Sequence, residues 1–143
     1  MNRIYQTIQN NGGQNGDCFR CCIASILELP ARNVPHFYQN VANGGYTTPE
    51  EDRRVVAWFQ ALHMSYFETG YKQNFYSMMQ FMGDLTPDLT YVLSGGTADH
   101  FAHSVVCRGN QIIHNPASET IADPLPRPCA DGYYRVGIIV RNL

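Results

Sequence analysis

The stretch Gln14–Pro30, QNGDCFRCCIASILELP, decides how the first part of the chain folds. Apolar residues recur through it at helical spacing, and the proline that closes it disfavours a helical residue directly before it. Asp17 is a residue type that caps helices, because its carboxylate accepts hydrogen bonds from the first free backbone N–H groups. We therefore expect a buried helix over Cys18–Glu28, with a thiol in its first turn.

The remaining segments predict helices first and strands afterwards. Pro49 opens a second helix, and a third has a methionine-rich face that we interpret as core. The expected buried face of the second helix is Val55, Val56, Phe59 and Leu62. Strands are predicted over 3–9, 65–70, 90–96, 103–109, 111–116 and 133–143. This order indicates an α+β fold, with N-terminal helices packed on a C-terminal antiparallel sheet, in one domain over residues 1–143.

Composition excludes several classes of function. Of the 143 residues 44% are hydrophobic, and the formal net charge is −2, so neither a basic nucleic-acid surface nor a polybasic membrane contact is expected. The N-terminal stretch has no hydrophobic signal-peptide region, and no apolar run approaches the roughly 18 residues of a spanning helix. Five cysteines, with three crowded together, do not suit a secreted disulfide framework. We expect a cytoplasmic protein with reduced cysteines.

The three crowded cysteines allow four interpretations: a zinc site, a redox pair, core residues or a nucleophile. Cys18 and Cys21 form a C-x2-C pair, but no second knuckle follows, and a redox C-x-x-C motif requires a βαβ context that is absent here. Cys21 and Cys22 are expected to be buried small apolar residues. Cys18 is the best nucleophile candidate, because the free N–H groups of a helix start favour a thiolate. No metal and no cofactor are expected.

A cysteine nucleophile requires a histidine base. Among His36, His63, His100, His103 and His114, the best candidate is His103, which begins a predicted strand. If residues 108–110 form a three-residue hairpin loop with Asn110 left-handed, His103 falls opposite Asn115, with Cβ atoms about 5 Å apart. A two-residue loop would place His103 opposite Pro116 instead. The prediction that Asn115 orients the imidazole therefore depends on the turn.

These motifs resemble the papain-like cysteine hydrolases. The segment GDCFRCCIAS is similar to the calpain-type nucleophile segment, and HSVVCRGNQIIHNP is similar to the histidine and Asp/Asn strands of bacteriocin leader peptidases. Together with IYQT, both segments resemble a group of small bacterial and phage proteins described as papain-like hydrolases. The resemblance covers residues 4–37 and 103–116. It implies a papain-like fold with Cys18 as nucleophile, His103 as general base and acid, and Asn115 as orienter.

The resemblance also implies a glutamine that donates to the oxyanion. The usual spacing of about six residues before the nucleophile falls on Gly12, so Gln6 and Gln14 are the candidates, and we prefer Gln6. The expected function is a thiol hydrolase that cleaves an amide, peptide or isopeptide bond of a protein or peptide substrate. Two alternatives stay open. One is a catalytically inactive fold that binds and inhibits a partner protein, for example in phage counter-defence. The other is deamidation or acyl transfer by the same triad.

Overall fold

The computed structural model describes residues 1–8, 16–41, 49–99, 102–118 and 123–142, and shows an α+β fold with a five-stranded antiparallel sheet. The helices are α1 (Cys18–Leu27), the 3-10 helix η1 (Ala31–Asn33), α2 (Pro49–Ala61) and α3 (Phe75–Leu85). The strands are β1 (Met64–Tyr71), β2 (Thr90–Gly96), β3 (Ala102–Arg108), β4 (Gln111–His114) and β5 (Tyr134–Arg141). Their order in the sheet is β1-β5-β2-β3-β4, and every neighbouring pair is antiparallel.

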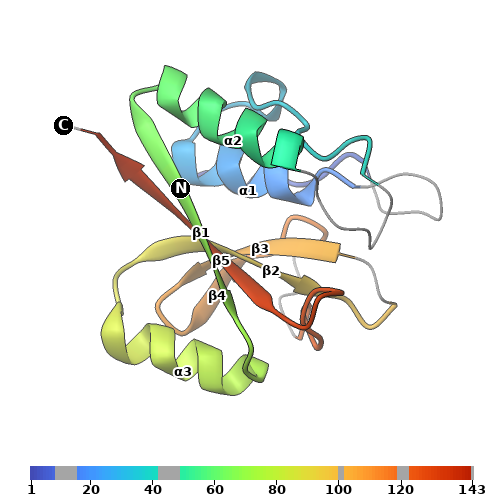
Figure 1. The fold of residues 1–143 in the computed structure, drawn as a ribbon, viewed down its shortest axis with the longest axis vertical. Helices are drawn as coiled ribbons and strands as arrows, with labels where there is room; N and C mark the ends of the chain where they lie inside the picture. Colours follow the sequence, from blue (N-terminus) through green and yellow to red (C-terminus); the bar gives the residue numbers. More distant parts are fainter. Residues whose placement is uncertain (9–15, 42–48, 100–101, 119–122, 143) are drawn as a thin grey trace.

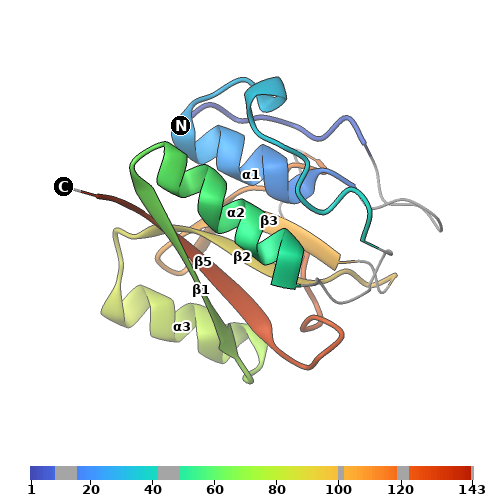
Figure 2. The ribbon, with the colours of Figure 1, turned by 45° about the horizontal axis from the view of Figure 1, so that its top comes forward.

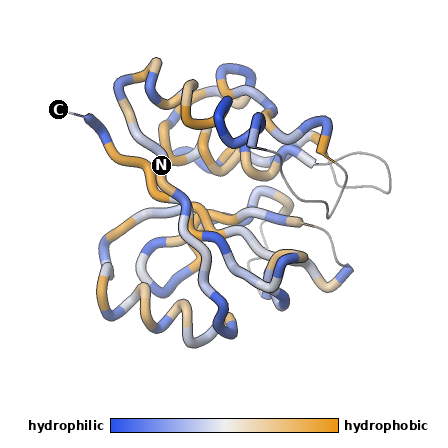
Figure 3. The backbone as a smooth tube through the Cα atoms, viewed as in Figure 1, coloured by the Kyte–Doolittle hydropathy of each residue, from blue (hydrophilic) through white to orange (hydrophobic). Residues whose placement is uncertain are grey.

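Helices cover both faces of this sheet (Figure 1). α1 and α2 lie on one face, where Cys22, Ile23 and Phe59 pack with Val92 and Val106. α3 lies on the other face, and its methionines pack with buried residues of β2, β3 and β5, as the sequence predicts. The hydrophobic colouring of α1 and of the middle of β5 follows this burial (Figure 3). No described helix has the length and apolar character needed to cross a membrane.

Three sequence predictions about secondary structure are wrong. β1 confirms the strand predicted over 65–70, but it precedes α3, and α3 covers the opposite face, so the helices do not all precede the sheet or share one side of it. Residues 3–8, expected within a strand, form none. Val56 and Leu62 of the second helical segment are 38% and 40% exposed, whereas Val55 and Phe59 of α2 are buried.

The expected cap of α1 is also wrong in its chemistry. Asp17 stands at the N-cap position, but its side chain makes no capping hydrogen bond. Its Oδ1 instead accepts from the backbone N–H of Ile8, at 3.1 Å. Residues 1–8 run alongside α1 toward its first turn (Figure 2), so they form a strap along the helix rather than a strand. We call residues 4–8 the N-terminal strap.

The turn between β3 and β4 differs from the expected three-residue loop. Arg108 pairs with Gln111, so the loop is the two-residue Gly109–Asn110, and Gly109, not Asn110, takes the left-handed conformation (φ 55°). A β-bulge between Val106 and Cys107 then shifts the register. The predicted opposition of His103 and Asn115 in the ladder is therefore wrong, and β4 ends at His114.

Candidate active site

His103 and Asn115 meet even though the ladder does not pair them. The Nε2 of His103 lies 2.7 Å from the Asn115 Oδ1, and both residues are buried. The same Oδ1 accepts a hydrogen bond from the backbone N–H of Ala117, at 3.1 Å. An oxygen that already accepts from an N–H group is an acceptor for the imidazole as well, so Nε2 carries the proton. The neutral ring therefore presents an unprotonated Nδ1 on its other side.

Cys18 is the second partner of the imidazole, and because Asn115 engages Nε2, the nitrogen left for Cys18 is Nδ1. Its side chain hydrogen-bonds His103, and the backbone N–H groups of Ser104 and Phe19 donate to the sulfur. Burial raises the pKa of Cys18, but the bond and charge of His103, with these two N–H groups, outweigh it and hold the pKa below its ordinary value. Cys18 is 6% exposed.

The electrostatics of His103 complement those of Cys18. Burial lowers the pKa of His103, but the bond to Cys18, the charge of its thiolate and the Asn115 amide raise it above its ordinary value. Each partner thus favours the charged form of the other, which is the requirement for a thiolate–imidazolium pair. The site brings together Cys18, His103 and Asn115 from the start of α1, the start of β3 and the residue after β4.

The other four cysteines have the opposite character. All five are free, and Cys21 and Cys22 are completely buried, as predicted. Burial raises the pKa of Cys21 and of Cys107 to about 12 and that of Cys129 to about 11. The described residues hold no group of three or more His, Cys, Asp or Glu side chains that could bind a metal ion.

The two oxyanion candidates have different outcomes. Gln14 lies outside the described residues. Gln6 lies in the N-terminal strap, where its backbone N–H donates to the Pro116 carbonyl, next to Asn115, and its Nε2 donates to the Ile8 carbonyl. Gln6 is 8% exposed, and its Oε1 has no hydrogen-bond partner. One hydrogen of the Gln6 amide is therefore engaged within the strap, and its role as an oxyanion donor stays a prediction.

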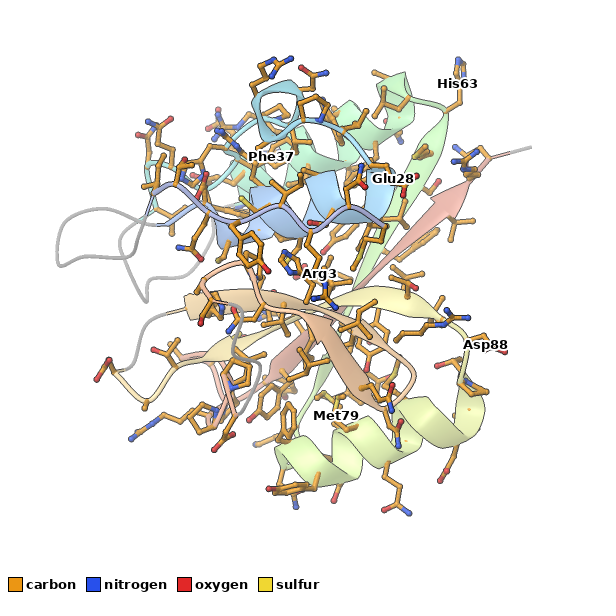
Figure 4. All side chains as sticks on the ribbon, turned by 180° about the vertical axis from the view of Figure 1, so that it is seen from behind. Arg3, Glu28, Phe37, His63, Met79 and Asp88 are labelled. Carbon is orange, nitrogen blue, oxygen red and sulfur yellow. The ribbon has the colours of Figure 1, made fainter. Side chains whose placement is uncertain are left out.

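Several contacts at the site have no signal in the sequence. The backbone N–H groups of Ser104 and Ala117 act regardless of residue type, so no motif announces them. His114, 2% exposed, donates from Nε2 to the Ile4 carbonyl at 2.8 Å, and its ring meets Tyr5 edge-on. It therefore holds the N-terminal strap. In Figure 4, the label of Arg3 marks the N-terminal segment that leads into the strap and runs alongside α1.

The chain was compared with protein-family models, with curated proteins and with solved structures. No family model, no curated protein and no solved structure matches it.

Proposed function

We propose that the protein is a thiol hydrolase of the papain-like kind, in which Cys18 is the nucleophile, His103 the general base and acid, and Asn115 the orienter. One observation carries this proposal. Cys18 is the cysteine whose pKa is lowered, it bonds His103, and the Asn115 amide holds Nε2 of that histidine. A merely buried cysteine would have a raised pKa, as Cys22 has.

The proposed reaction forms an acyl-enzyme. The Cys18 thiolate adds to a substrate carbonyl, and the tetrahedral intermediate collapses as the proton on His103 Nδ1 passes to the leaving amine. A water molecule then attacks the thioester and gives its proton to Nδ1. The carboxylic acid product leaves, and the thiolate–imidazolium pair is restored. The N-terminus of α1 favours negative charge and suits the oxyanion, with Gln6 as the candidate side-chain donor.

The substrate class follows from the nucleophile and from the resemblance to papain-like hydrolases. A thiolate held by an imidazolium is suited to amide carbonyls, because the imidazolium protonates a poor amine leaving group. Peptide and isopeptide bonds of a protein are therefore the proposed substrates, and transfer of the acyl group to an amine, or deamidation, would use the same acyl-enzyme. Five free cysteines support a reducing compartment, so we propose that the protein acts in the cytoplasm.

The first experiment measures the intact mass after brief iodoacetamide treatment between about pH 5 and 9, the range over which an ordinary thiol of pKa about 8.5 changes from unreactive to reactive. Wild type should label at Cys18 on the acid side of this range, and Cys18→Ala should not label there. In His103→Ala the remaining burial raises the pKa of Cys18, so labelling should move to the alkaline side. His63→Asn, at an exposed histidine with a left-handed backbone, is the matched control.

A second step tests the acyl-enzyme itself. p-Nitrophenyl acetate, a small activated ester, should acetylate Cys18 of the wild type, and the adduct should decay as water hydrolyses the thioester. In His103→Ala any adduct that forms should persist, because no base activates the water. If wild-type Cys18 labels only as an ordinary thiol and forms no acetyl adduct, the hydrolase proposal is wrong, and a partner-binding function becomes the one to test.

A further inference from the structure

Two hydrogen-bonded ties fasten the N-terminal strap beside the proposed catalytic residues. At one tie, Ile8 and Asp17 bond in both directions: the Ile8 N–H donates to the Asp17 Oδ1 at 3.1 Å, and the Asp17 N–H donates to the Ile8 carbonyl at 3.2 Å. At the other, the Gln6 N–H donates to the Pro116 carbonyl at 2.9 Å. Asp17 precedes Cys18 and Pro116 follows Asn115, so the strap links the two ends of the triad.

The Asp17 carboxylate is unusual for its position. An aspartate before the first helical residue normally accepts from N–H groups of the first turn. Here it is 1% exposed, makes no capping bond and turns toward the strap. Its Oδ2 lies 3.8 Å from the Arg20 Nε, an ion-pair distance without a hydrogen bond. The N–H of Phe19 is consequently left for the Cys18 sulfur, to which it donates.

We propose that Asp17 is a positioning residue of the thiol site, whose carboxylate leaves α1 uncapped and instead fastens the N-terminal strap to the helix start beside Cys18. This rests on the proposed function, because a positioning role needs a reactive thiol to position. The strap then determines the separation between the start of α1 and the segment 115–116, and with it the alignment of Cys18 on the imidazole that Asn115 holds.

The same tie also places the oxyanion candidate. The Ile8 carbonyl accepts from the Asp17 N–H and from the Gln6 Nε2, at 3.2 and 2.9 Å. If the Ile8–Asp17 tie is lost, the Gln6 amide loses the acceptor that fixes it. Asp17 thus acts on Cys18 directly along the chain and on Gln6 through Ile8.

The test compares Asp17→Ala, which removes the acceptor for the Ile8 N–H, with Asp17→Asn, whose amide oxygen retains it. Ser25→Ala is the matched control. Ser25 is completely buried and its Oγ accepts from the Ile4 N–H at 2.9 Å, so this variant also removes one strap bond, but two turns away from Cys18. Two readouts are used: hydrogen exchange of the Ile8 amide by NMR, and the pH profile of Cys18 labelling by iodoacetamide.

We expect Asp17→Ala to speed Ile8 amide exchange about tenfold, as the loss of a protecting hydrogen bond does. Labelling of Cys18 at pH 6 should slow about threefold or more, within the range of one hydrogen bond. Asp17→Asn should keep both values near wild type. Ser25→Ala should melt at a lower temperature yet keep the labelling profile, because its tie is remote from the thiol.

Two results would overturn the proposal: Asp17→Ala behaving as wild type in both readouts, or Ser25→Ala shifting the labelling profile as much as Asp17→Ala. Failure of the proposed function looks different. In that case wild-type Cys18 already labels like an ordinary thiol, while Ile8 exchange still depends on Asp17. The tie would then be a structural contact only, and its positioning role would be rejected together with the hydrolase.

Discussion

His103 Nε2 contacts the Asn115 Oδ1 at 2.7 Å, although Asn115 lies beyond the last residue of β4. Asn115 therefore makes this contact from a position outside the sheet, and not as the paired residue of His103 in the β3–β4 ladder. The Ala117 N–H holds the amide from behind, so the asparagine has a single orientation in which its oxygen faces the ring. This arrangement assigns the proton to Nε2 and leaves Nδ1 for Cys18.

Asn115 should control how much of the thiol site is charged. In Asn115→Ala the imidazolium loses an acceptor, and a hydrogen bond to a charged group contributes about 1.5–3 kcal/mol. The fraction of thiolate–imidazolium pair, and with it the acid-side labelling rate of Cys18, should therefore fall about tenfold or more. The measurement is the iodoacetamide rate as a function of pH.

Asn115→Asp is the informative partner of that variant. A carboxylate in the same place keeps an acceptor and adds negative charge, which raises the pKa of His103 and so extends the ion pair toward alkaline pH. Acid-side labelling should stay near the wild-type rate. Equal loss in the alanine and aspartate variants would show that Asn115 acts through packing alone.

The pKa of His103 should depend on Cys18. The bond and charge of Cys18 are the main influences that raise this pKa, whereas burial lowers it. In Cys18→Ser burial remains but the thiolate is gone, so the His103 pKa should fall. NMR titration of the imidazole measures this change. His114 is an internal control, because its pKa is lowered mainly by burial and should stay low in the variant.

That dependence has a consequence for folding stability with a definite sign. A histidine whose folded pKa is raised stabilises the protein fully below its unfolded pKa of about 6.5, and loses this contribution as pH rises through the folded pKa. The lowered pKa of Cys18 acts oppositely: its contribution is present above the ordinary thiol pKa and is lost as pH falls through the folded value. These two contributions to the free energy of unfolding are measured by urea unfolding of wild type and of Cys18→Ser across pH.

The sequence predicted which side chains meet better than it predicted the backbone geometry that brings them together. Helical spacing and a capping residue type place Cys18 in the first turn of α1, because apolar periodicity and helix propensity act locally. The methionine face of α3 follows the same logic. Asp17 shows the limit: its residue type predicts a cap, but its carboxylate bonds a strap nine residues away, and no local rule anticipates a tertiary partner.

The hairpin shows a second limit. Arg108, Gly109 and Asn110 are compatible with two-residue and three-residue turns, and the choice changes the register by one residue. The structure has the two-residue turn and a bulge, each of which moves His103 away from direct pairing with Asn115. The predicted contact nevertheless forms, because Asn115 lies beyond the end of β4 and its side chain reaches His103 from outside the ladder. The sequence predicted that His103 and Asn115 meet, but it did not predict the geometry by which they do so.

Iodoacetamide should label Cys18 selectively at neutral pH as well as at acidic pH. The pKa values of Cys21 and Cys107 are raised to about 12 and that of Cys129 to about 11, so their thiolate fractions at neutral pH are very small. One equivalent of iodoacetamide should therefore modify only Cys18 in the folded protein, and peptide mapping locates it. In urea the buried thiols return to ordinary values and all five should react. Modification of Cys129 ahead of Cys18 in the folded protein would contradict the proposed site.

Gly137 should be essential for the packing of the sheet against α2. A Cβ at Gly137 of β5 would overlap the hydroxyl and ring of Tyr66, whose ring stacks on Phe59. Gly137→Ala must displace this aromatic pair, and overpacking of a filled core costs about 1–3 kcal/mol. Gly70→Ala is the control, since its Cβ would meet only Tyr133, at 3.3 Å. Urea unfolding should show a clear loss for Gly137→Ala and a smaller one for Gly70→Ala. Equal stability of the two variants would mean that Tyr66 has room to move, and that the Phe59–Tyr66 stack does not determine how α2 lies on the sheet.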